Sequence, residues 1–233
     1  MRALLAALVL LLAGCMPVVP ADYEPVTVEP GPVPGYLVYL REAGRDTWGS
    51  CAGAAVARRL VLTVAHCARS AETVATRDGT AVGLASVVLW PGADFAMVRT
   101  TLPLPVDELA ELAVARPGAA QVFGICPFYR SPERVRLAEY DGWFVVGVQV
   151  VERWQVDGGR VCSGDSGGVV VQDGRVVGFI SAVEPEPPLI PWFASGRRFY
   201  TVPTIVAVWL GGAHETGTAR LDGARRIAGT SWR

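Results

Sequence analysis

The residues with the clearest chemical potential lie in a short glycine-rich stretch, Cys162–Gly168, which reads CSGDSGG. A serine between glycines can occupy a tight turn in which its hydroxyl is exposed and neighbouring backbone N–H groups converge. Ser166 is therefore a candidate nucleophile, and the N–H groups of Gly164 and Ser166 are candidate donors to an oxyanion. A serine hydroxyl is a weak nucleophile at neutral pH, so this chemistry also requires a base.

Two histidines are available as that base. His66 stands directly at the end of an apolar, strand-like stretch, whereas His214 lies in the C-terminal tail. A histidine base also needs a carboxylate that fixes its tautomer and stabilises the imidazolium. Asp94 opens an apolar strand-like segment and is the expected partner. The alternatives are Asp78, which lies in a turn signal, and Asp107, which lies between the two halves of the chain.

Short β-strands are the elements expected to position these residues. Val-rich segments with strand character are Tyr36–Leu40, Leu60–Val64, Val82–Leu89, Phe95–Val98, Gln121–Ile125, Trp143–Val151, Val169–Val171 and Val176–Ile180. Asp-Gly pairs at 78–79, 141–142, 157–158 and 173–174 predict turns between strands. Many short strands with few helical periods predict an all-β sandwich or barrel. Asp107–Ala115 is expected to be a short helix or a loop joining two halves, and Ile205–Leu210 a short terminal helix.

Composition excludes several classes of function. The chain has 233 residues, of which 51% are hydrophobic and 18% charged, as expected of a folded domain. The formal net charge of −1 argues against a strongly basic nucleic-acid-binding protein. The absence of lysine excludes lysine-dependent catalysis. Because there is no C-x-x-C pair and histidine is scarce, we expect no structural zinc site.

The N-terminal region predicts export. Residues 1–14 carry one arginine followed by an apolar run that is short for a membrane span, which is typical of a signal peptide. The run ends in LAGC, which resembles the lipobox of bacterial lipoproteins and makes Cys15 the expected lipidation site. An ordinary secretory signal is the alternative. Residues 15–35 are Pro-rich and predict an extended tether. Residues 211–233 are expected to be a flexible tail.

The segments around His66, Asp94 and Ser166 together resemble the chymotrypsin/trypsin-like serine proteases. The resemblance extends over residues 36–210 and includes the family's chain order of His, Asp and Ser. It implies two six-stranded antiparallel β-barrels with the three side chains in the cleft between them. It further implies that His66 is the general base, Asp94 its orienting carboxylate, Ser166 the nucleophile, and Gly164 with Ser166 the oxyanion donors.

Four cysteines remain once Cys15 is set aside, and the sequence alone leaves their three pairings open. The resemblance implies a Cys51–Cys67 disulfide, equivalent to the family's histidine-loop bridge. Cys126 and Cys162 are then expected to form the second pair. That pairing departs from the family, in which the cysteine matching Cys162 bonds to one downstream of the nucleophile. Two free buried thiols are the alternative.

The specificity region also departs from the family pattern. Trypsin has a carboxylate six residues before its nucleophile, where this chain has Arg160, so a preference for basic substrates is not expected. Ser181 matches a residue that binds the substrate backbone, and Val183 is expected to narrow the pocket entrance. Arg160 and Arg198 suggest recognition of acidic side chains, unless both face solvent.

The family's activation mechanism has no counterpart in this sequence. In the family, a new N-terminal amine pairs with the carboxylate matching Asp165. Because the activation segment is missing, Asp165 is expected to pair with an arginine such as Arg130 or Arg134, and the site is expected to fold without proteolytic activation.

The resemblance therefore predicts a serine endopeptidase that acts on protein or peptide substrates and requires no cofactor. The N-terminal region predicts that this protein is anchored outside the cytoplasm by a lipid, or is secreted or periplasmic. Two other functions stay open at this point. One is a catalytically silent protease-like module that binds or scaffolds partners in the cell envelope. The other is an esterase that uses the same three side chains, although the alternation of β-strands and α-helices that surrounds the nucleophile in such enzymes is missing.

Overall fold

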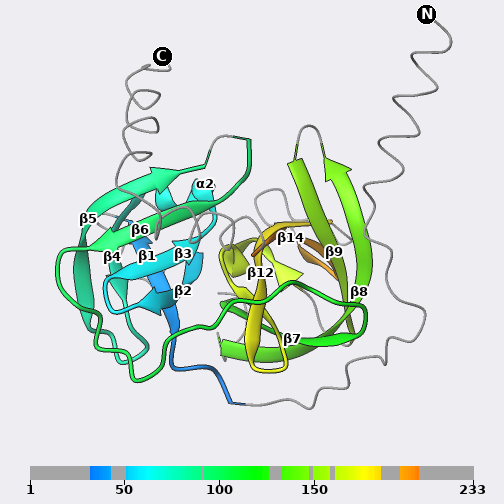
Figure 1. Ribbon diagram of the computed structural model, residues 1–233, viewed down its shortest axis with the longest axis horizontal. Coiled ribbons are helices and arrows are strands. Elements are labelled where there is room, and N and C mark those ends of the chain that lie inside the picture. Colours follow the sequence, from blue (N-terminus) through cyan, green and yellow to red (C-terminus); the bar gives the residue numbers. More distant parts are fainter. Residues whose placement is uncertain are drawn as a thin grey trace, which may run out of the picture.

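Two β-barrels make up most of the described part of the chain (Figure 1). The computed structural model describes residues 32–42, 51–90, 92–125, 133–146, 149–157, 161–184 and 195–204. Each barrel is a closed sheet of six antiparallel strands, which confirms the predicted fold class. The expected terminal helix, Ile205–Leu210, lies outside the described residues, as do the predicted signal peptide and tail.

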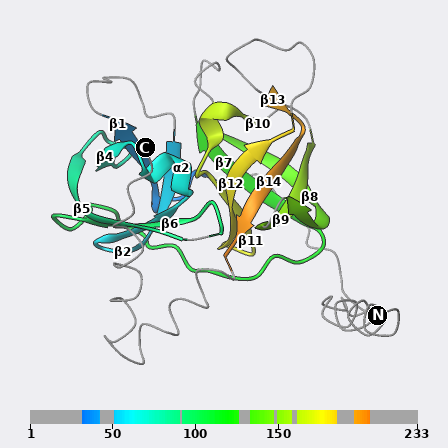
Figure 2. The ribbon, with the colours of Figure 1, turned by 90° about the horizontal axis from the view of Figure 1, so that it is seen from above.

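The first barrel carries its strands in the order β1-β2-β3-β6-β5-β4. These strands are β1 (Leu37–Glu42), β2 (Cys51–Ala57), β3 (Leu60–Thr63), β4 (Ala71–Ala75), β5 (Ala81–Leu89) and β6 (Ala96–Thr100). A one-turn helix, α2 (Ala65–Ala68), follows β3. Seen from above in Figure 2, this helix lies on the side of the first barrel that faces the second barrel.

The second barrel carries its strands in the order β11-β12-β14-β9-β8-β7. These strands are β7 (Ala119–Ile125), β8 (Glu133–Val146), β9 (Gln149–Asp157), β11 (Val169–Gln172), β12 (Arg175–Val183) and β14 (Arg198–Pro203). A small two-stranded sheet pairs β10 (Val161–Cys162) with β13 (Ser195–Gly196). A single 3₁₀ turn, η1 (Ser163–Asp165), links β10 to the candidate nucleophile.

Strands β2 and β4 are not among the predicted segments, because they are rich in small residues with weak β propensity. In β2, the sequence CAGAAVA packs four consecutive buried residues into a close approach between strands. A Cβ atom added at Gly53 would lie 2.8 Å from the carbonyl oxygen of Leu62. The need for small side chains therefore comes from tertiary contacts, which a strand pattern does not reveal.

The Asp-Gly pairs have different outcomes. Asp173 and Gly174 both have positive φ, 49° and 74°, and form the tight turn predicted between β11 and β12. Gly142, with φ 119°, instead lies inside β8 where the register with β9 shifts. The turn predicted at this pair is therefore wrong, and the pair forms a β-bulge. The single strand predicted over Trp143–Val151 is in fact divided between β8 and β9.

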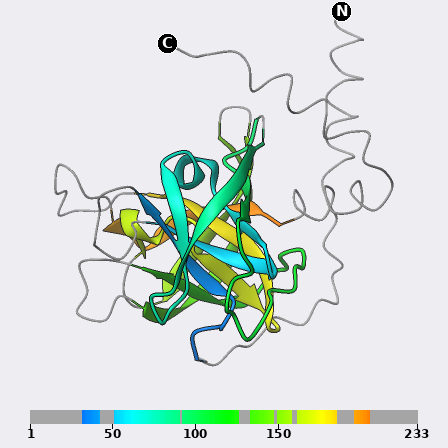
Figure 3. The same ribbon diagram turned by 90° about the vertical axis from the view of Figure 1, so that its left-hand side faces the viewer.

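The core joins the two barrels. Figure 3 looks along the line between them, with the first barrel in front. One buried cluster contains side chains from both barrels, and a second fills the interior of the second barrel. Phe95, directly after Asp94, packs against Phe179 of β12 with ring centroids 6.0 Å apart. This contact fixes the segment that carries the candidate acid against the second barrel.

The segment between β6 and β7 is an extended loop, so of the two forms expected for Asp107–Ala115 the loop is the observed one. Its backbone pairs with Val176 of β12 through Glu111 and Ala113, at 2.8 and 2.9 Å. Within the described ranges, no helix has the length and apolar character needed to span a membrane.

A buried carboxylate lies inside the second barrel. Glu152 of β9 is fully buried, and its Oε2 accepts a hydrogen bond of 3.1 Å from the Thr201 hydroxyl. Within the described part of the chain, neither Glu152 Oε1 nor the hydroxyl of Tyr140 has a hydrogen-bond partner. Burial raises the pKa of Glu152 to about 8, although the Thr201 bond acts in the opposite direction. Tyr140 is the titratable group facing it, and burial followed by the charge of Glu152 raises the pKa of Tyr140.

This arrangement predicts that the free energy of unfolding falls between about pH 4.5 and pH 8. In that window the folded chain keeps the proton on Glu152 while the unfolded chain has released it, so rising pH favours unfolding by roughly 1.4 kcal/mol per pH unit. When urea unfolding is measured across this pH range, the free energy of unfolding of the natural chain should decrease with rising pH. This decrease should be absent in Glu152→Gln. The exposed Glu111→Gln serves as the control. An identical slope in Glu152→Gln would contradict the assignment.

Candidate active site

His66 is held at a fixed place by α2 and a disulfide. The helix begins two residues after the end of β3, and β3 is buried, so the end of this strand fixes the position of His66. The next residue, Cys67, forms a disulfide with Cys51 at the start of β2, with Cα atoms 5.7 Å apart. The predicted histidine-loop disulfide is therefore confirmed. It ties the base to a second strand of the first barrel.

Asp94 collects three hydrogen bonds. Its Oδ2 accepts one of 2.7 Å from His66 Nδ1, and its Oδ1 accepts one of 2.9 Å from the His66 backbone N–H. The Ser181 hydroxyl donates a third, of 2.7 Å, to Oδ2. Because an ionised carboxylate only accepts hydrogen bonds, the proton of the neutral imidazole belongs on Nδ1, and Nε2 is left as an acceptor.

These contacts also determine the charge of the acid. Burial raises the pKa of Asp94, but the hydrogen bonds from His66 and Ser181 outweigh burial, and the net pKa lies below its ordinary value. Asp94 is therefore ionised at neutral pH and able to stabilise an imidazolium beside it. The His66 side chain is 44% exposed while that of Asp94 is 18% exposed, so the base faces solvent and the acid lies behind it.

The loop that carries Ser166 is bound closely to both barrels. The Ser166 carbonyl accepts a hydrogen bond of 2.7 Å from the Ala52 N–H of β2. The Gly167 N–H donates one of 2.7 Å to the Ile180 carbonyl of β12. Gly167 has φ +75°, and a Cβ atom there would lie 1.9 Å from the Ala52 carbonyl oxygen. Only glycine meets both requirements.

The same two strands hold the imidazole–carboxylate pair. On β2, the residue whose N–H binds the Ser166 carbonyl is Ala52. It directly follows Cys51, and the disulfide of Cys51 anchors Cys67, the residue after His66. On β12, Ser181, which binds Asp94, directly follows Ile180, which binds Gly167. The structure thus brings the predicted base, acid and nucleophile to neighbouring anchor points on β2 and β12.

The predicted oxyanion donors lie in and just after the 3₁₀ turn. Gly164 is inside η1 and Ser166 follows it with φ −51°. In a 3₁₀ helix each N–H group points at the carbonyl three residues earlier. The Ser166 N–H is therefore directed back toward the turn, which would have to rearrange for this N–H to face an oxyanion.

Asp165, next to the nucleophile, is fully buried. Its Oδ2 accepts a hydrogen bond of 2.8 Å from the Cys162 N–H, and the carboxylate lies so close to Gly124 that a Cβ there would be 2.5 Å from Oδ1. Of its predicted partners, Arg130 and the side chain of Arg134 lie outside the described residues. That ion pair stays a prediction.

The remaining predicted site residues are more scattered. Cys162 is disulfide-bonded, and its expected partner Cys126 lies outside the described residues, as do Arg160 and Cys15. Val183 is half-buried and packs against the core of the second barrel, and its expected role at the pocket entrance stays a prediction.

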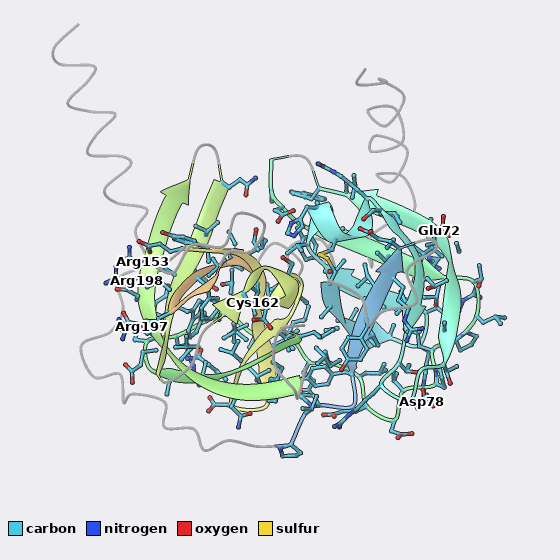
Figure 4. The ribbon with its side chains drawn as sticks, turned by 180° about the vertical axis from the view of Figure 1, so that it is seen from behind. Glu72, Asp78, Arg153, Cys162, Arg197 and Arg198 are labelled. Atoms are coloured by element: carbon cyan, nitrogen blue, oxygen red, sulfur yellow. A yellow bond between two sulfur atoms is a disulfide. The ribbon has the colours of Figure 1, made fainter. Side chains whose placement is uncertain are left out.

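Arg198 lies with Arg153 and Arg197 at the side of the second barrel away from the first (Figure 4). The side chain of Arg198 is 49% exposed, and its Nη1 lies 3.9 Å from Oε1 of Glu184. The chain itself therefore already places a carboxylate beside this arginine. Cys162, in contrast, lies toward the middle of the molecule.

One group of side chains has metal-ligand spacing among the described residues. The ligand atoms of Cys51, His66 and Cys67 lie within 4.8 Å of one another. Both sulfur atoms belong to the disulfide, so neither is a thiolate that could bind a cation. The residues present do not fit a metal site in this oxidised form.

Solved structures with the same fold are trypsin- or chymotrypsin-like serine proteases. Kallikrein-related peptidase 10 is 21% identical, with a TM-score of 0.62 over 78% of this chain and 97% of its own. The HtrA-type protease AlgW with a decapeptide is 16% identical, with a TM-score of 0.57 over 74% of this chain and 61% of its own. Rv3671c from M. tuberculosis, as an inactive mutant form, is 19% identical, with a TM-score of 0.57 over 79% and 89%. No protein-family model and no curated protein matches the sequence. At these identities the comparison establishes the fold.

The Cys51–Cys67 disulfide predicts a measurable contribution to stability. The bridge joins two cysteines that are 16 positions apart in the sequence. Such a cross-link restricts the unfolded chain, so removing it costs about 3 kcal/mol of stability. The double variant Cys51→Ala/Cys67→Ala should lose about this amount in urea unfolding under oxidising conditions. A change below about 1 kcal/mol would contradict an anchoring role for the bridge.

Proposed function

We propose that this chain is a serine endopeptidase that hydrolyses peptide bonds through an acyl-enzyme. The observation that carries the proposal is the 2.7 Å bond between His66 and Asp94, held by the same two strands that hold the Ser166 loop. The protease fold of the neighbouring structures supports it at the level of architecture.

The proposed reaction begins when Ser166 Oγ attacks the substrate carbonyl and its proton passes to His66 Nε2. Asp94 stabilises the imidazolium that forms. The imidazolium then gives this proton to the leaving amine, and the C–N bond breaks to leave an ester on Ser166. Water, deprotonated by His66, hydrolyses the ester and restores the hydroxyl.

A peptide substrate is supported by the open edge of β12. The pairing of β11 with β12 ends at Val169 and Phe179, whereas β14 continues along β12 to Val183. In the described strands, residues 181–183 of β12 therefore have a sheet partner on one side. An extended peptide can add to such an edge through backbone hydrogen bonds, and Ser181 places this edge beside Asp94.

A catalytically silent binding module is the second candidate, and η1 is the observation that favours it. A loop whose Ser166 N–H points back into a 3₁₀ turn does not present two donors to an oxyanion. An esterase would use the same residues and differ in its substrate.

For localisation, we propose an extracytoplasmic lipoprotein anchored through Cys15, with a secreted or periplasmic protein as the alternative. The support is the LAGC sequence after the apolar run and the Pro-rich segment that follows. Metabolic labelling with a palmitate analogue should mark the natural chain and fail in Cys15→Ala. Equal labelling of both chains would exclude this anchor.

A fluorophosphonate probe tests the proposed nucleophile. The probe should attach covalently to Ser166 and be lost in Ser166→Ala and His66→Ala, because the first removes the attacking oxygen and the second the base. Ser86→Ala, an exposed serine of β5, is the matched control and should react normally. Intact-mass and peptide mass spectrometry give the readout.

A natural chain that never reacts at Ser166 would favour the silent module. Turnover of peptides against simple esters then separates a peptidase from an esterase.

A further inference from the structure

A buried threonine connects the strands that carry the candidate catalytic residues. The Thr63 hydroxyl donates a hydrogen bond of 2.6 Å to the Ala52 carbonyl, and Thr63 is fully buried. The N–H of the same Ala52 donates the 2.7 Å bond to the Ser166 carbonyl. Ala52 is therefore held on its carbonyl side by Thr63 and on its N–H side by the nucleophile loop.

The contact behind the nucleophile is unusually close. A Cβ atom at Gly167 would lie 1.9 Å from the Ala52 oxygen and 2.5 Å from Thr63 Oγ1. The Gly167 backbone therefore rests directly on the Thr63–Ala52 hydrogen bond. Any change in the position of the Ala52 carbonyl alters how closely the Ser166 loop approaches the first barrel.

Thr63 is also adjacent to the other two residues. It is the last residue of β3, three positions before His66, and it pairs across the sheet with Ala96, two positions after Asp94. A β-branched side chain suits this strand position, and valine has that shape without a hydroxyl. Strand formation alone therefore does not require the hydroxyl of Thr63.

We propose that Thr63 is a positioning residue that sets the spacing between the His66–Asp94 pair and Ser166. The inference rests on the proposed function. Thr63 touches neither substrate nor the reacting atoms in this account, and it acts through the Ala52 backbone.

Thr63→Val removes the hydroxyl and keeps the shape, whereas Thr63→Ser keeps the hydroxyl. Phosphonylation of Ser166 by a fluorophosphonate, followed over a range of probe concentrations, separates the maximal rate from the concentration at half-maximal rate. A misplacement of the order of 1 Å costs about 100-fold in rate, so Thr63→Val should lose roughly 10- to 100-fold in maximal rate. The half-saturating concentration should stay unchanged, and Thr63→Ser should restore most of the rate.

Thr100→Val is the matched control. Thr100 is also fully buried, and its hydroxyl donates a 2.7 Å bond to the Leu102 carbonyl, away from the Ser166 loop. All variants are compared at a temperature where circular dichroism shows them folded, so a loss of stability does not enter the rate. Thr100→Val should react at the natural rate.

The positioning role would be overturned, while the proposed function stands, if folded Thr63→Val had the same maximal rate of phosphonylation as the unsubstituted chain. Equal losses of this rate in Thr63→Val and Thr100→Val would have the same consequence. A natural chain that does not react at Ser166 would overturn both.

Discussion

The close approach of the Ser166 loop to the first barrel is the constraint on which the rest of the site depends. The loop belongs to the second barrel, yet its backbone lies against Ala52 of β2 with no room for a Cβ atom at Gly167. The hydrogen bond from Ala52 to the Ser166 carbonyl fixes the distance at which the two barrels meet. The packing of Phe95 against Phe179 supports the same interface from its apolar side. The proposed transfer of a proton from Ser166 on one barrel to His66 on the other depends on this contact.

Electrostatics follow from that geometry. Asp94 is drawn toward the interface, where burial alone would favour its neutral form, and the donors from His66 and Ser181 keep it ionised. Glu152 shows the opposite outcome inside the second barrel, because one hydrogen bond does not compensate for full burial. The two carboxylates differ in the number of donors that reach them. In this fold, the charged acid lies where both barrels contribute donors, from helix α2 of the first and from β12 of the second.

The sequence predicted those features of the fold and of the candidate site that a local pattern of residues determines. The CSGDSGG stretch, the histidine after an apolar strand and the resemblance that joins them with Asp94 predicted the two-barrel fold. The contacts that complete the site join residues far apart in the chain. Ser181 and Asp94, which meet in the candidate site, are 87 residues apart. Inside the second barrel, Thr201 and Glu152 are likewise 49 residues apart. The alanine-rich strand β2 was not predicted, because its small residues are required by close packing against neighbouring strands. The glycines of the CSGDSGG stretch do not by themselves determine the 3₁₀ conformation of η1.

The central claim is that the base and the acid act on Ser166 as one unit, and a double-mutant cycle tests it most directly. The second-order rate of Ser166 phosphonylation is measured in the natural chain, in His66→Ala, in Asp94→Asn and in the combined variant. Since Asp94 acts only through the imidazole, the combined variant should react no more slowly than His66→Ala alone. Losses that multiply in the combined variant, or rates that match the natural chain in either single variant, would contradict the account.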